Sequence, residues 1–437
     1  MNIILLSGGS GSRLWPLSNT IRSKQFIKIF KNQKGIYESM VQRVYRQIIK
    51  VAPDANIIIA TSKAQVSAIQ NQLGDGVGVS IEPCRRDTFP AIALAGNYLQ
   101  DVQGVNTDEV VVICPVDPYV EADYFEAIRE LSEHVGRTRA NLSLLGIQPI
   151  YPSEKYGYII PKTSEEVSQV LSFKEKPNEV VAKEYIEQGG LWNGGIFACK
   201  LEYLINKSHE LIEYKDYKDL FNKYDTLNKI SFDYAVVENE KEIDVFRFGG
   251  EWKDVGTWNT LAETMSENTV GNVIMSDDSK NTHVINELDL PVLCMGTENL
   301  IVSASVDGIL VSSKEKSSYI KPYVDEIIGD ARYAEKSWGE YRVLDASEDS
   351  LTVKVTLNPG HQMNYHSHER RDEVWSITRG EGYTVIDGIR QKVEAGDVIT
   401  MKAGCKHTII AITRIELIEV QLGKEISVSD KKKYVLE

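Results

Sequence analysis

The sequence lacks several features that would mark whole classes of protein. Its five cysteines, at positions 84, 114, 199, 294 and 405, stand singly without a CxxC pair, which favours free thiols in a reducing cytoplasm over a disulfide framework. No apolar run reaches the roughly 18 residues that a membrane-spanning helix needs. Met1 and Asn2 lead straight into an apolar run, without the basic region and cleavage site of a signal peptide. We therefore expect a cytoplasmic protein that has no membrane partner.

Basic residues are too few for a general nucleic-acid binder. Lys and Arg number 49 against 63 Asp and Glu, a formal net charge of −14, so phosphate backbones would be repelled. A small anionic substrate is still compatible with this charge, because a local basic pocket can exist in an acidic protein. With 42% apolar and 26% charged residues over 437 positions, the composition is that of a folded protein of two or three domains.

The pattern of apolar residues changes twice along the chain. Over residues 1–268, apolar runs at 2–6, 56–60, 110–114 and 142–147 alternate with helical patterns at 36–51, 91–99 and 124–135. This alternation predicts an α/β domain with three layers and a parallel sheet. Residues 269–334 carry short β-like pieces and a linker that we expect to include a helix. Residues 335–437 carry short strands separated by turns, which is typical of a sandwich or jelly-roll barrel.

A glycine-rich loop follows the first predicted strand. Gly8, Gly9 and Gly11 let the backbone approach a bulky anion, and Arg13 and Lys24 can neutralise phosphate charge. The loop lacks the GK[ST] ending of a Walker A loop, and Leu14 stands where GxGxxG needs its last glycine. Taken alone, the glycines are equally compatible with a flexible turn.

The whole segment 6–26, LSGGSGSRLWPLSNTIRSKQF, is more specific than its glycines. It resembles the signature of the sugar-1-phosphate nucleotidyltransferases, and among them the mannose-1-phosphate guanylyltransferases, with departures at Asn19 and Ser23. Seven further segments resemble this family's motifs in the same order. They are EPCRRDT (82–88), PVD (115–117), KYGYI (155–159), FKEKP (173–177), WNGGIF (192–197), FDYA (232–235) and WKDVGTW (252–258).

The resemblance implies a Rossmann-like domain with a mixed sheet and assigns roles to particular residues. Asp117 and Asp254 would hold Mg²⁺ against the α-phosphate, and Arg13 and Lys24 would stabilise the transition state. By position alone, each aspartate is more readily a loop or helix cap, although Asp117 does end a strand where open α/β sheets bind ligands. The other implied contacts are Gly8, Gly9, Gly11, Glu82 and Arg86 for the nucleotide, and Gly157, Glu175, Lys176 and Asn193 for the sugar phosphate.

Histidines gather near the carboxy terminus. His366 and His368 would lie on the same face of a strand, with Glu373 and His407 further along the chain. Three imidazoles and a carboxylate suit a divalent transition metal such as Zn, Ni, Mn or Fe. The spacing G(x5)HxH(x4)E(x6)G, from 360 to 380, resembles the cupin pattern closely. An exposed HxH on a barrel is the alternative.

In long members of the guanylyltransferase family, the carboxy-terminal cupin is a phosphomannose isomerase. The resemblance to that isomerase is incomplete, because Asn364 replaces a glutamine and the acidic stretch after the last predicted strand is missing. If the isomerase is active, Arg370 or Arg371 would hold its phosphate. Otherwise the domain would be a structural or sensory cupin.

The resemblance therefore implies transfer of GMP from GTP to mannose 1-phosphate, which forms GDP-mannose and diphosphate. Departures at Asp87, Lys155 and Gly194 leave room for another sugar 1-phosphate, such as a manno-heptose 1-phosphate used for a surface polysaccharide. A non-catalytic sugar-sensing regulator is a third hypothesis, which the retained cations and aspartates argue against. Edge strands in the middle region leave a homodimer open.

Overall fold

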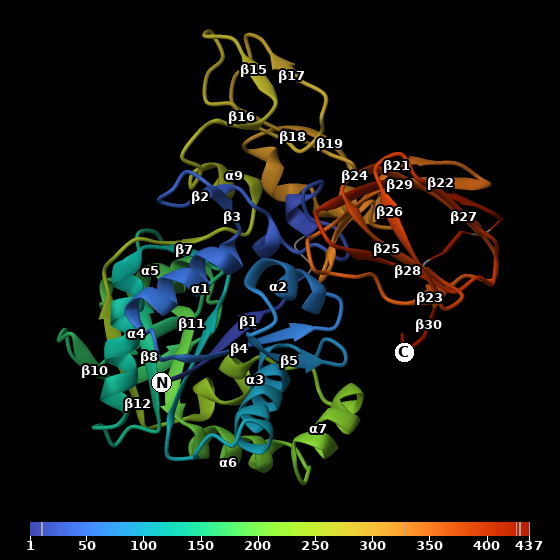
Figure 1. Cartoon of the computed structure of the whole chain (residues 1–437). Helices are drawn as coiled ribbons and strands as arrows, with labels where there is room; N and C mark the ends of the chain where they lie inside the picture. Colours follow the sequence, from blue (N-terminus) through green and yellow to red (C-terminus); the bar gives the residue numbers. More distant parts are fainter. Residues whose placement is uncertain (10–11, 328, 425, 428–429, 437) are drawn as a thin grey trace. The chain divides into compact units, whose positions relative to one another are not determined.

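The computed structural model of the chain describes residues 1–9, 12–327, 329–424, 426–427 and 430–436 (Figure 1). These residues form two units. The first contains Met1–Gly9, Lys24–Val66 and Gly76–Ser266, and the second contains Ser10–Ser23, Ser67–Asp75 and Glu267–Glu437. The sequence pattern does not indicate that segment 10–23 belongs to the second unit. The three-domain boundaries remain a prediction. No helix in the described ranges is both long and apolar enough to span a bilayer.

The first unit is built on a nine-stranded mixed sheet, ordered β5-β4-β1-β6-β11-β8-β12-β10-β9. Four strands at one end run parallel, namely β5 (Gly78–Glu82), β4 (Asn56–Ser62), β1 (Asn2–Ser7) and β6 (Val110–Pro115). The antiparallel β11 (Leu191–Lys200) separates β6 from β8 (Leu142–Ile147). The remaining strands are β12 (Ile243–Phe248), β10 (Val167–Lys174) and β9 (Tyr158–Pro161). The sheet is thus mixed, as the family resemblance implies, whereas the apolar runs by themselves predict a parallel sheet. An apolar run shows that a strand is buried but not in which direction its neighbour runs.

Helices cover both faces of this sheet. Ile4, Ile58 and Ile113 lie in one core with apolar side chains of α3 (Thr88–Asn97) and α6 (Leu201–Leu211). The alternate side chains, such as Ile3 and Leu5, are buried as well, which confirms the three layers. Helix α1 (Met40–Val51) lies beside α4 (Ala122–Val135) (Figure 1). The other helices described in this unit are α5 (Glu179–Glu187), α7 (Tyr217–Lys223), α8 (Phe232–Ala235) and α9 (Trp258–Ala262), whereas α2 (Val66–Leu73) belongs from Ser67 onward to the second unit.

Helix α1 begins four residues later than its apolar spacing predicts. Ser39 is its N-cap and accepts a hydrogen bond from the Gln42 backbone N–H, while the Gln42 side chain accepts one from Ser39 N–H. This capping box satisfies two amide groups that the first turn leaves unpaired. The preceding residues form β3 (Tyr37–Glu38), which pairs with β2 (Phe30–Lys31).

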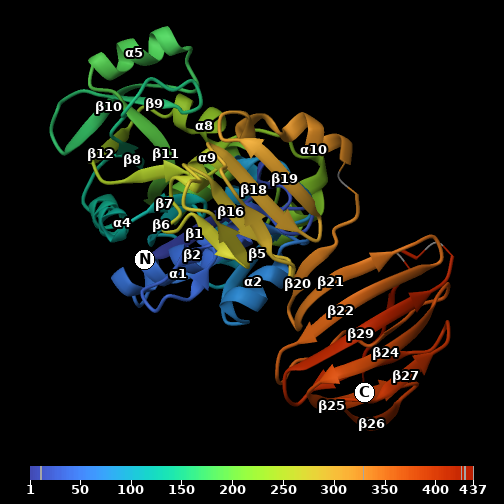
Figure 2. The same ribbon diagram turned by 90° about the horizontal axis from the view of Figure 1, so that it is seen from above.

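The second unit contains a β coil in which consecutive strands stack without intervening helices (Figure 2). Strands β14 (Thr269–Gly271), β16 (His283–Asn286) and β18 (Leu300–Ser305) are parallel, and β19 (Gly308–Ser313) is antiparallel to β18. A second parallel pair joins β15 (Val273–Met275) to β17 (Val292–Cys294). The helix expected in the linker is α10 (Lys321–Ile327).

Asn19 and Arg22, in the second unit, make polar contacts with this β coil. The Arg22 guanidinium donates to both carboxylate oxygens of Glu287, at 2.8 and 2.9 Å. The Asn19 amide donates to Asp307 Oδ2 at 2.9 Å. Since Arg22 is only 6% exposed, its charge depends on Glu287 for compensation inside the second unit.

Two sheets face each other in the carboxy-terminal part of the second unit. Apolar side chains of both sheets, including Trp375, Leu417 and Ile409, form one core between them. The six-stranded sheet contains β20 (Tyr333–Lys336), β21 (Gly339–Ala346), β22 (Ser350–Leu357), β29 (Ile415–Leu422), β24 (Asp372–Arg379) and β27 (Val398–Met401). The five-stranded sheet contains β26 (Ile389–Glu394), β25 (Glu381–Ile386), β28 (His407–Ala411), β23 (His366–Ser367) and β30 (Lys432–Lys433).

Candidate functional site

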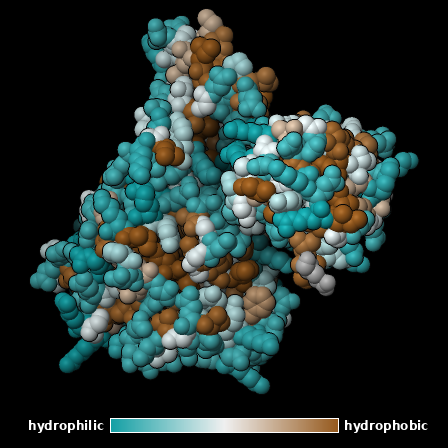
Figure 3. Space-filling model, in the orientation of Figure 1, coloured by the Kyte–Doolittle hydropathy of each residue, from teal (hydrophilic) through white to brown (hydrophobic). Residues whose placement is uncertain are grey.

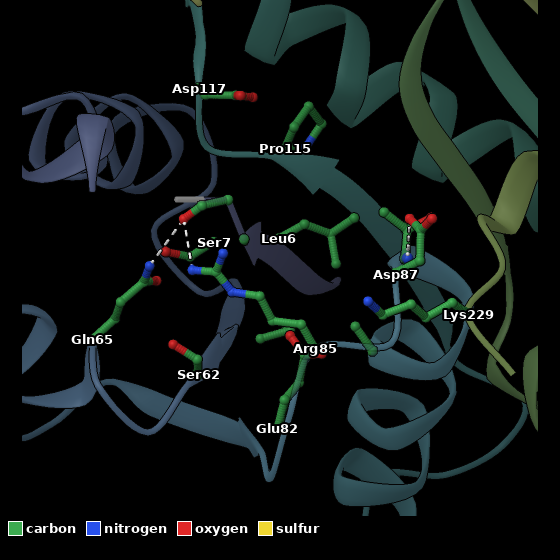
Figure 4. A pocket seen from close by; sticks show the side chains of 15 residues that line it. Leu6, Ser7, Ser62, Gln65, Glu82, Arg85, Asp87, Pro115, Asp117 and Lys229 are labelled. Carbon is green, nitrogen blue, oxygen red and sulfur yellow. Dashed lines mark hydrogen bonds between the residues drawn. The ribbon is translucent and has the colours of Figure 1, made fainter. Parts of the chain in front are cut away.

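A cavity of about 430 Å³ opens at the carboxyl ends of the parallel strands of the first unit (Figure 4). Ser7, Ser62, Glu82 and Pro115, which end four of these strands, all line it. Such an edge is where open α/β sheets bind ligands, and the volume is in the range of small-molecule sites. The other lining residues are Leu6, Gly8, Gly9, Ala60, Gln65, Arg85, Asp87, Thr88, Ala91, Asp117 and Lys229.

The glycine turn forms part of the cavity wall and is held by two side chains. Gly9 has a φ of 101°, a left-handed conformation that glycine adopts without a Cβ penalty. Its carbonyl accepts hydrogen bonds from Arg85 Nη2 at 3.1 Å and Gln65 Nε2 at 3.4 Å (Figure 4). A Cβ built on Gly8 or Gly9 would meet no atom within 4 Å, so the turn borders open space. Gly11 lies outside the described residues.

Arg13 and Arg86, two of the predicted cations, are not among the residues that line the cavity, and their roles stay predictions. Arg13 is exposed in η1 (Ser12–Leu14), which belongs to the second unit. Arg86 donates a hydrogen bond to the Asp225 carbonyl. Among the described residues, the neighbouring Arg85 lines the cavity and Arg86 does not. Adjacent arginines in the segment 82–88 leave this choice open in the sequence, because only the direction of each side chain decides it. Lys229, which also lines the cavity, has no motif that could have indicated it.

Asp117, Asp254 and Lys24 converge in the first unit. Strand β13 (Trp252–Asp254) pairs antiparallel with β7 (Pro118–Val120), so Asp254 lies opposite Pro118, the residue after Asp117. Lys24 Nζ is 2.8 Å from Asp117 Oδ2 and 3.7 Å from Asp254 Oδ1. A short ladder thus brings together two aspartates that are more than a hundred residues apart in the sequence.

This pair of carboxylates fits a hard divalent cation. Mg²⁺ takes oxygen ligands and is commonly held by one or two carboxylates together with substrate phosphates. The two carboxylates already contact one ammonium group, which shows that they share a position where positive charge is stabilised. Both are about two-fifths exposed, at 39% and 42%, so a phosphate could complete the coordination.

The four residues predicted for the sugar phosphate form a second cluster in the first unit. Lys176 Nζ lies 2.6 Å from Glu175 Oε1. A Cβ built on Gly157 would lie against the Glu175 carboxylate and 3.4 Å from Asn193 Cβ, so Gly157 is in close contact with both residues. The Asn193 amide donates to Asp233 Oδ1 at 2.6 Å.

A separate group of metal-ligating side chains occupies the carboxy-terminal sandwich. His366, His368, Glu373 and His407 are all buried, and one ligand atom from each lies within 4.8 Å of the others. His366 on β23 pairs with His407 on β28, while Glu373 projects from the opposite sheet. The histidine and glutamate spacing in the sequence therefore correctly indicated four residues that come together in the structure.

Each of the three histidines uses its Nδ1 atom in a contact with a backbone carbonyl. His366 Nδ1 is 2.6 Å from the Asn364 carbonyl and His407 Nδ1 is 3.0 Å from the Cys405 carbonyl, while His368 Nδ1 donates to the Asp430 carbonyl. Because a carbonyl only accepts, each Nδ1 carries the proton and each Nε2 carries the lone pair. His407 Nε2 and Glu373 Oε2 are buried and lie 3.2 Å from each other. This donor set fits a divalent transition metal.

Arg371 is the nearest cation to these ligands. Its Nε donates to Glu373 Oε1 at 3.1 Å, and its Nη2 lies 3.0 Å from His368 Nε2. The guanidinium is buried, whereas the side chain of Arg370 is 50% exposed. Of the two arginines suggested for a phosphate, Arg371 is therefore engaged with the ligand set itself.

Two models of known protein families match the chain. The model of the family described as nucleotidyl transferase matches residues 2–270. The chain belongs to this family. Residues 353–420 match the cupin domain family, so this nucleotidyl transferase carries a cupin at its carboxy-terminal side.

Relatives of this nucleotidyl transferase align over almost its full length. Mannose-1-phosphate guanylyltransferase of Escherichia coli strain K12 is 28% identical over 98% of this chain and 96% of its own. The alginate biosynthesis protein AlgA of Pseudomonas putida is 27% identical over 99% of this chain and 95% of its own. A crystal structure described as mannose-1-phosphate geranyltransferase from Thermus thermophilus is similar with a TM-score of 0.62 and 27% identity, over 75% of this chain and 99% of that one.

Asp233 is a residue of the nucleotidyl transferase to which the sequence motif assigned no role. It lies within the FDYA segment and touches Asn193 in the sugar-phosphate cluster. Burial, together with the negative charge of Glu175, raises its pKa from 3.8 to about 6. The motif indicated the segment, but only the fold shows that its carboxylate faces another carboxylate.

This pKa predicts how stability depends on pH. A carboxyl group whose pKa rises on folding binds its proton more tightly in the folded state, so it favours folding below pH 3.8 and loses that effect as the pH rises through 6. We expect Asp233→Asn to gain stability relative to wild type between these pH values, measured as urea midpoints. Asp54→Asn, at an exposed turn, is the control. Parallel pH profiles for Asp233→Asn and wild type would contradict the assignment.

Proposed function

We propose that this nucleotidyl transferase is a mannose-1-phosphate guanylyltransferase, which converts GTP and mannose 1-phosphate to GDP-mannose and diphosphate. The observation that carries the proposal is the convergence of Lys24, Asp117 and Asp254, with Asp117 also lining the glycine-walled cavity. The names of the full-length relatives support the choice of substrates.

In this reaction a phosphate oxygen of the sugar phosphate attacks the α-phosphorus of GTP, a new P–O bond forms, and the bond to the β-phosphate oxygen breaks. The chain's task is to position and neutralise charged groups rather than to supply a nucleophile. Gly8 and Gly9 give the phosphates an open approach, and Lys24 compensates negative charge beside the two aspartates. Mg²⁺, held by Asp117 and Asp254, would neutralise the α-phosphate and stabilise the charge of the transition state.

The guanine base of GTP would be recognised by Glu82, at the end of β5. Guanine offers N–H donors at N1 and at its exocyclic amine, and a carboxylate can accept both. Glu82 lines the cavity and is buried, and its Oε2 accepts from the Tyr224 hydroxyl at 2.7 Å, which fixes its orientation. Adenine presents an acceptor at N1, so this carboxylate would disfavour ATP.

The sugar phosphate would bind at the cluster around Glu175. Lys176 would contact its phosphate, and Glu175 and Asn193 would bond to hydroxyl groups. Because Gly157 has no side chain, the hexose ring could approach the Glu175 carboxylate closely. A manno-heptose 1-phosphate is the second candidate substrate, which the departures from the family motifs at Asp87, Lys155 and Gly194 leave open.

The deciding experiment is diphosphate release from each of four nucleoside triphosphates with a panel of sugar 1-phosphates. Rapid release with GTP and mannose 1-phosphate supports the proposal. Faster diphosphate release with manno-heptose 1-phosphate would make that sugar phosphate, rather than mannose 1-phosphate, the substrate. If no pair of nucleoside triphosphate and sugar 1-phosphate releases diphosphate, the result would favour a non-catalytic regulator.

We also propose that the cupin binds a divalent transition metal through His366, His368, Glu373 and His407. A second activity, interconversion of mannose 6-phosphate and fructose 6-phosphate, would need a group that carries a proton between C1 and C2. Burial and the nearby charge of Glu373 raise the pKa of Glu419 to about 7, which suits such a carrier. Assay of the full chain with mannose 6-phosphate and added metal tests this activity, and no product would leave a structural or sensory cupin.

A homodimer remains part of the proposal. Ile274 and Val311 on the strands of the β coil, and Met295 next to β17, are exposed by 60%, 65% and 70%. Figure 3 shows apolar side chains on the surface of this region. Exposed apolar surface of this kind favours self-association, which sedimentation would detect.

A further inference from the structure

Residues 430–434 lie along β23, which carries the candidate metal ligand His366 and directly precedes a second one, His368. Strand β30 is antiparallel to β23, with Lys433 opposite His366 and Lys432 opposite Ser367. The Tyr434 N–H donates to the Tyr365 carbonyl at 2.8 Å, which extends the contact beyond the ladder. The segment is therefore an integral part of the five-stranded sheet.

Asp430 touches His368 and the two residues after it. Its backbone carbonyl accepts from His368 Nδ1, across 62 positions of sequence. Its carboxylate accepts from the backbone N–H groups of Glu369 and Arg370, each at 3.0 Å. Asp430 is 9% exposed, so these contacts are shielded from water.

His368 differs in this respect from the other two histidines. His366 and His407 each use a carbonyl only two residues earlier, so their orientation is fixed locally. The orientation of His368 depends instead on a segment that is distant in the sequence. Without the Asp430 carbonyl, the His368 ring would lose the partner that holds its proton on Nδ1 and its lone pair on Nε2.

We propose that residues 430–434 complete the metal centre of the cupin and that Asp430 is a positioning residue for His368. This inference rests on the proposed cupin metal site and extends it to a segment outside the HxH motif and outside the matched cupin region, which ends at residue 420. The ligand class is a divalent transition metal, and the segment acts through the geometry of one imidazole.

The test measures cobalt(II) binding to the full-length protein by competition with a chelator, together with the cobalt absorption spectrum. Asp430→Ala keeps the backbone carbonyl that His368 uses, but it removes the carboxylate that holds the backbone of Glu369 and Arg370 against residues 430–434. Because the carbonyl is then no longer held in place beside His368, binding should weaken by about 10- to 100-fold, the range for partners of metal ligands. Asp430→Asn keeps a single carboxamide acceptor for the two N–H groups and should lie between Asp430→Ala and wild type. Lys432→Ala is the matched control, since its exposed side chain is removed while its backbone pairing remains. This control should bind as wild type does.

The outcomes separate the inference from the site on which it rests. If the wild-type protein binds no cobalt, the proposed metal centre is wrong. If the wild type binds cobalt and Asp430→Ala binds it equally well with the same spectrum, the role of Asp430 is wrong and the metal centre stands. A version ending at Ser427 should lose binding outright, with circular dichroism to check its fold. If the version ending at Ser427 is unfolded, the full-length Asp430→Ala variant decides whether Asp430 positions His368.

Discussion

Asp117→Ala should lower kcat for diphosphate release by at least about 10²- to 10³-fold, the range seen when one group that stabilises transition-state charge is removed. Asp117 lies 2.8 Å from Lys24 Nζ and shares that ammonium with Asp254. Its loss would leave Asp254 as the only carboxylate of the proposed pair to hold Mg²⁺. Because Asp117 is 39% exposed and ends a strand, the substitution should leave the fold intact.

The measurement compares diphosphate release by wild type, Asp117→Ala and Asp117→Asn across a magnesium titration. Asp117→Asn keeps the shape of the side chain and removes its charge, so it should be nearly as impaired. Asp54→Ala, at an exposed turn, is the matched control and should be fully active. A near-normal kcat for Asp117→Ala would remove this residue from the metal site. Equal thermal midpoints would show that lost activity does not reflect unfolding.

Glu287→Gln should lower the free energy of unfolding by about 3 kcal/mol, the lower end of the range for an uncompensated buried charge. The neutral amide cannot neutralise Arg22, whose guanidinium now makes two hydrogen bonds to the carboxylate and is 6% exposed. The lower end applies because Glu287 itself is 27% exposed. The loss should appear as a lower urea midpoint of unfolding of the second unit. Hydrogen exchange of the backbone amides of β16 and β18 is the measurement that reports on this unit.

Two comparisons make this prediction specific. Glu210→Gln breaks an ion pair with Lys207 on the exposed surface of α6 and should cost less than about 1 kcal/mol. The double variant Arg22→Met, Glu287→Leu removes both charges and should be more stable than Glu287→Gln alone, since no uncompensated charge remains. A Glu287→Gln variant as stable as wild type would mean that Arg22 finds solvent or another partner.

Several features of the two sites were predictable because they depend on residues that are close in the sequence. Gly8 and Gly9 follow an apolar strand, and the carboxyl end of such a strand faces the ligand edge of an α/β sheet. Asp117 is placed by the same rule after β6. The HxH spacing predicts that His366 and His368 lie on one side of a strand, and the structure does bring them together, although β23 ends at Ser367.

Other features depend on which segments meet, and no local pattern contains that information. The β13–β7 ladder places Asp254 beside Asp117, β11 enters the sheet antiparallel, and Arg85 rather than Arg86 faces the cavity. The FDYA motif indicated a segment, but the pKa of Asp233 arises only from its burial beside Glu175.

The sequence by itself therefore determined the class of each domain, the glycine turn and the identity of most candidate ligands, since these follow from residue type and short spacing. Tertiary structure alone decided that segment 10–23 packs in the second unit and that Asp430 orients His368. These contacts join residues dozens to hundreds of positions apart, and their geometry is set by strand pairing and burial of the whole chain.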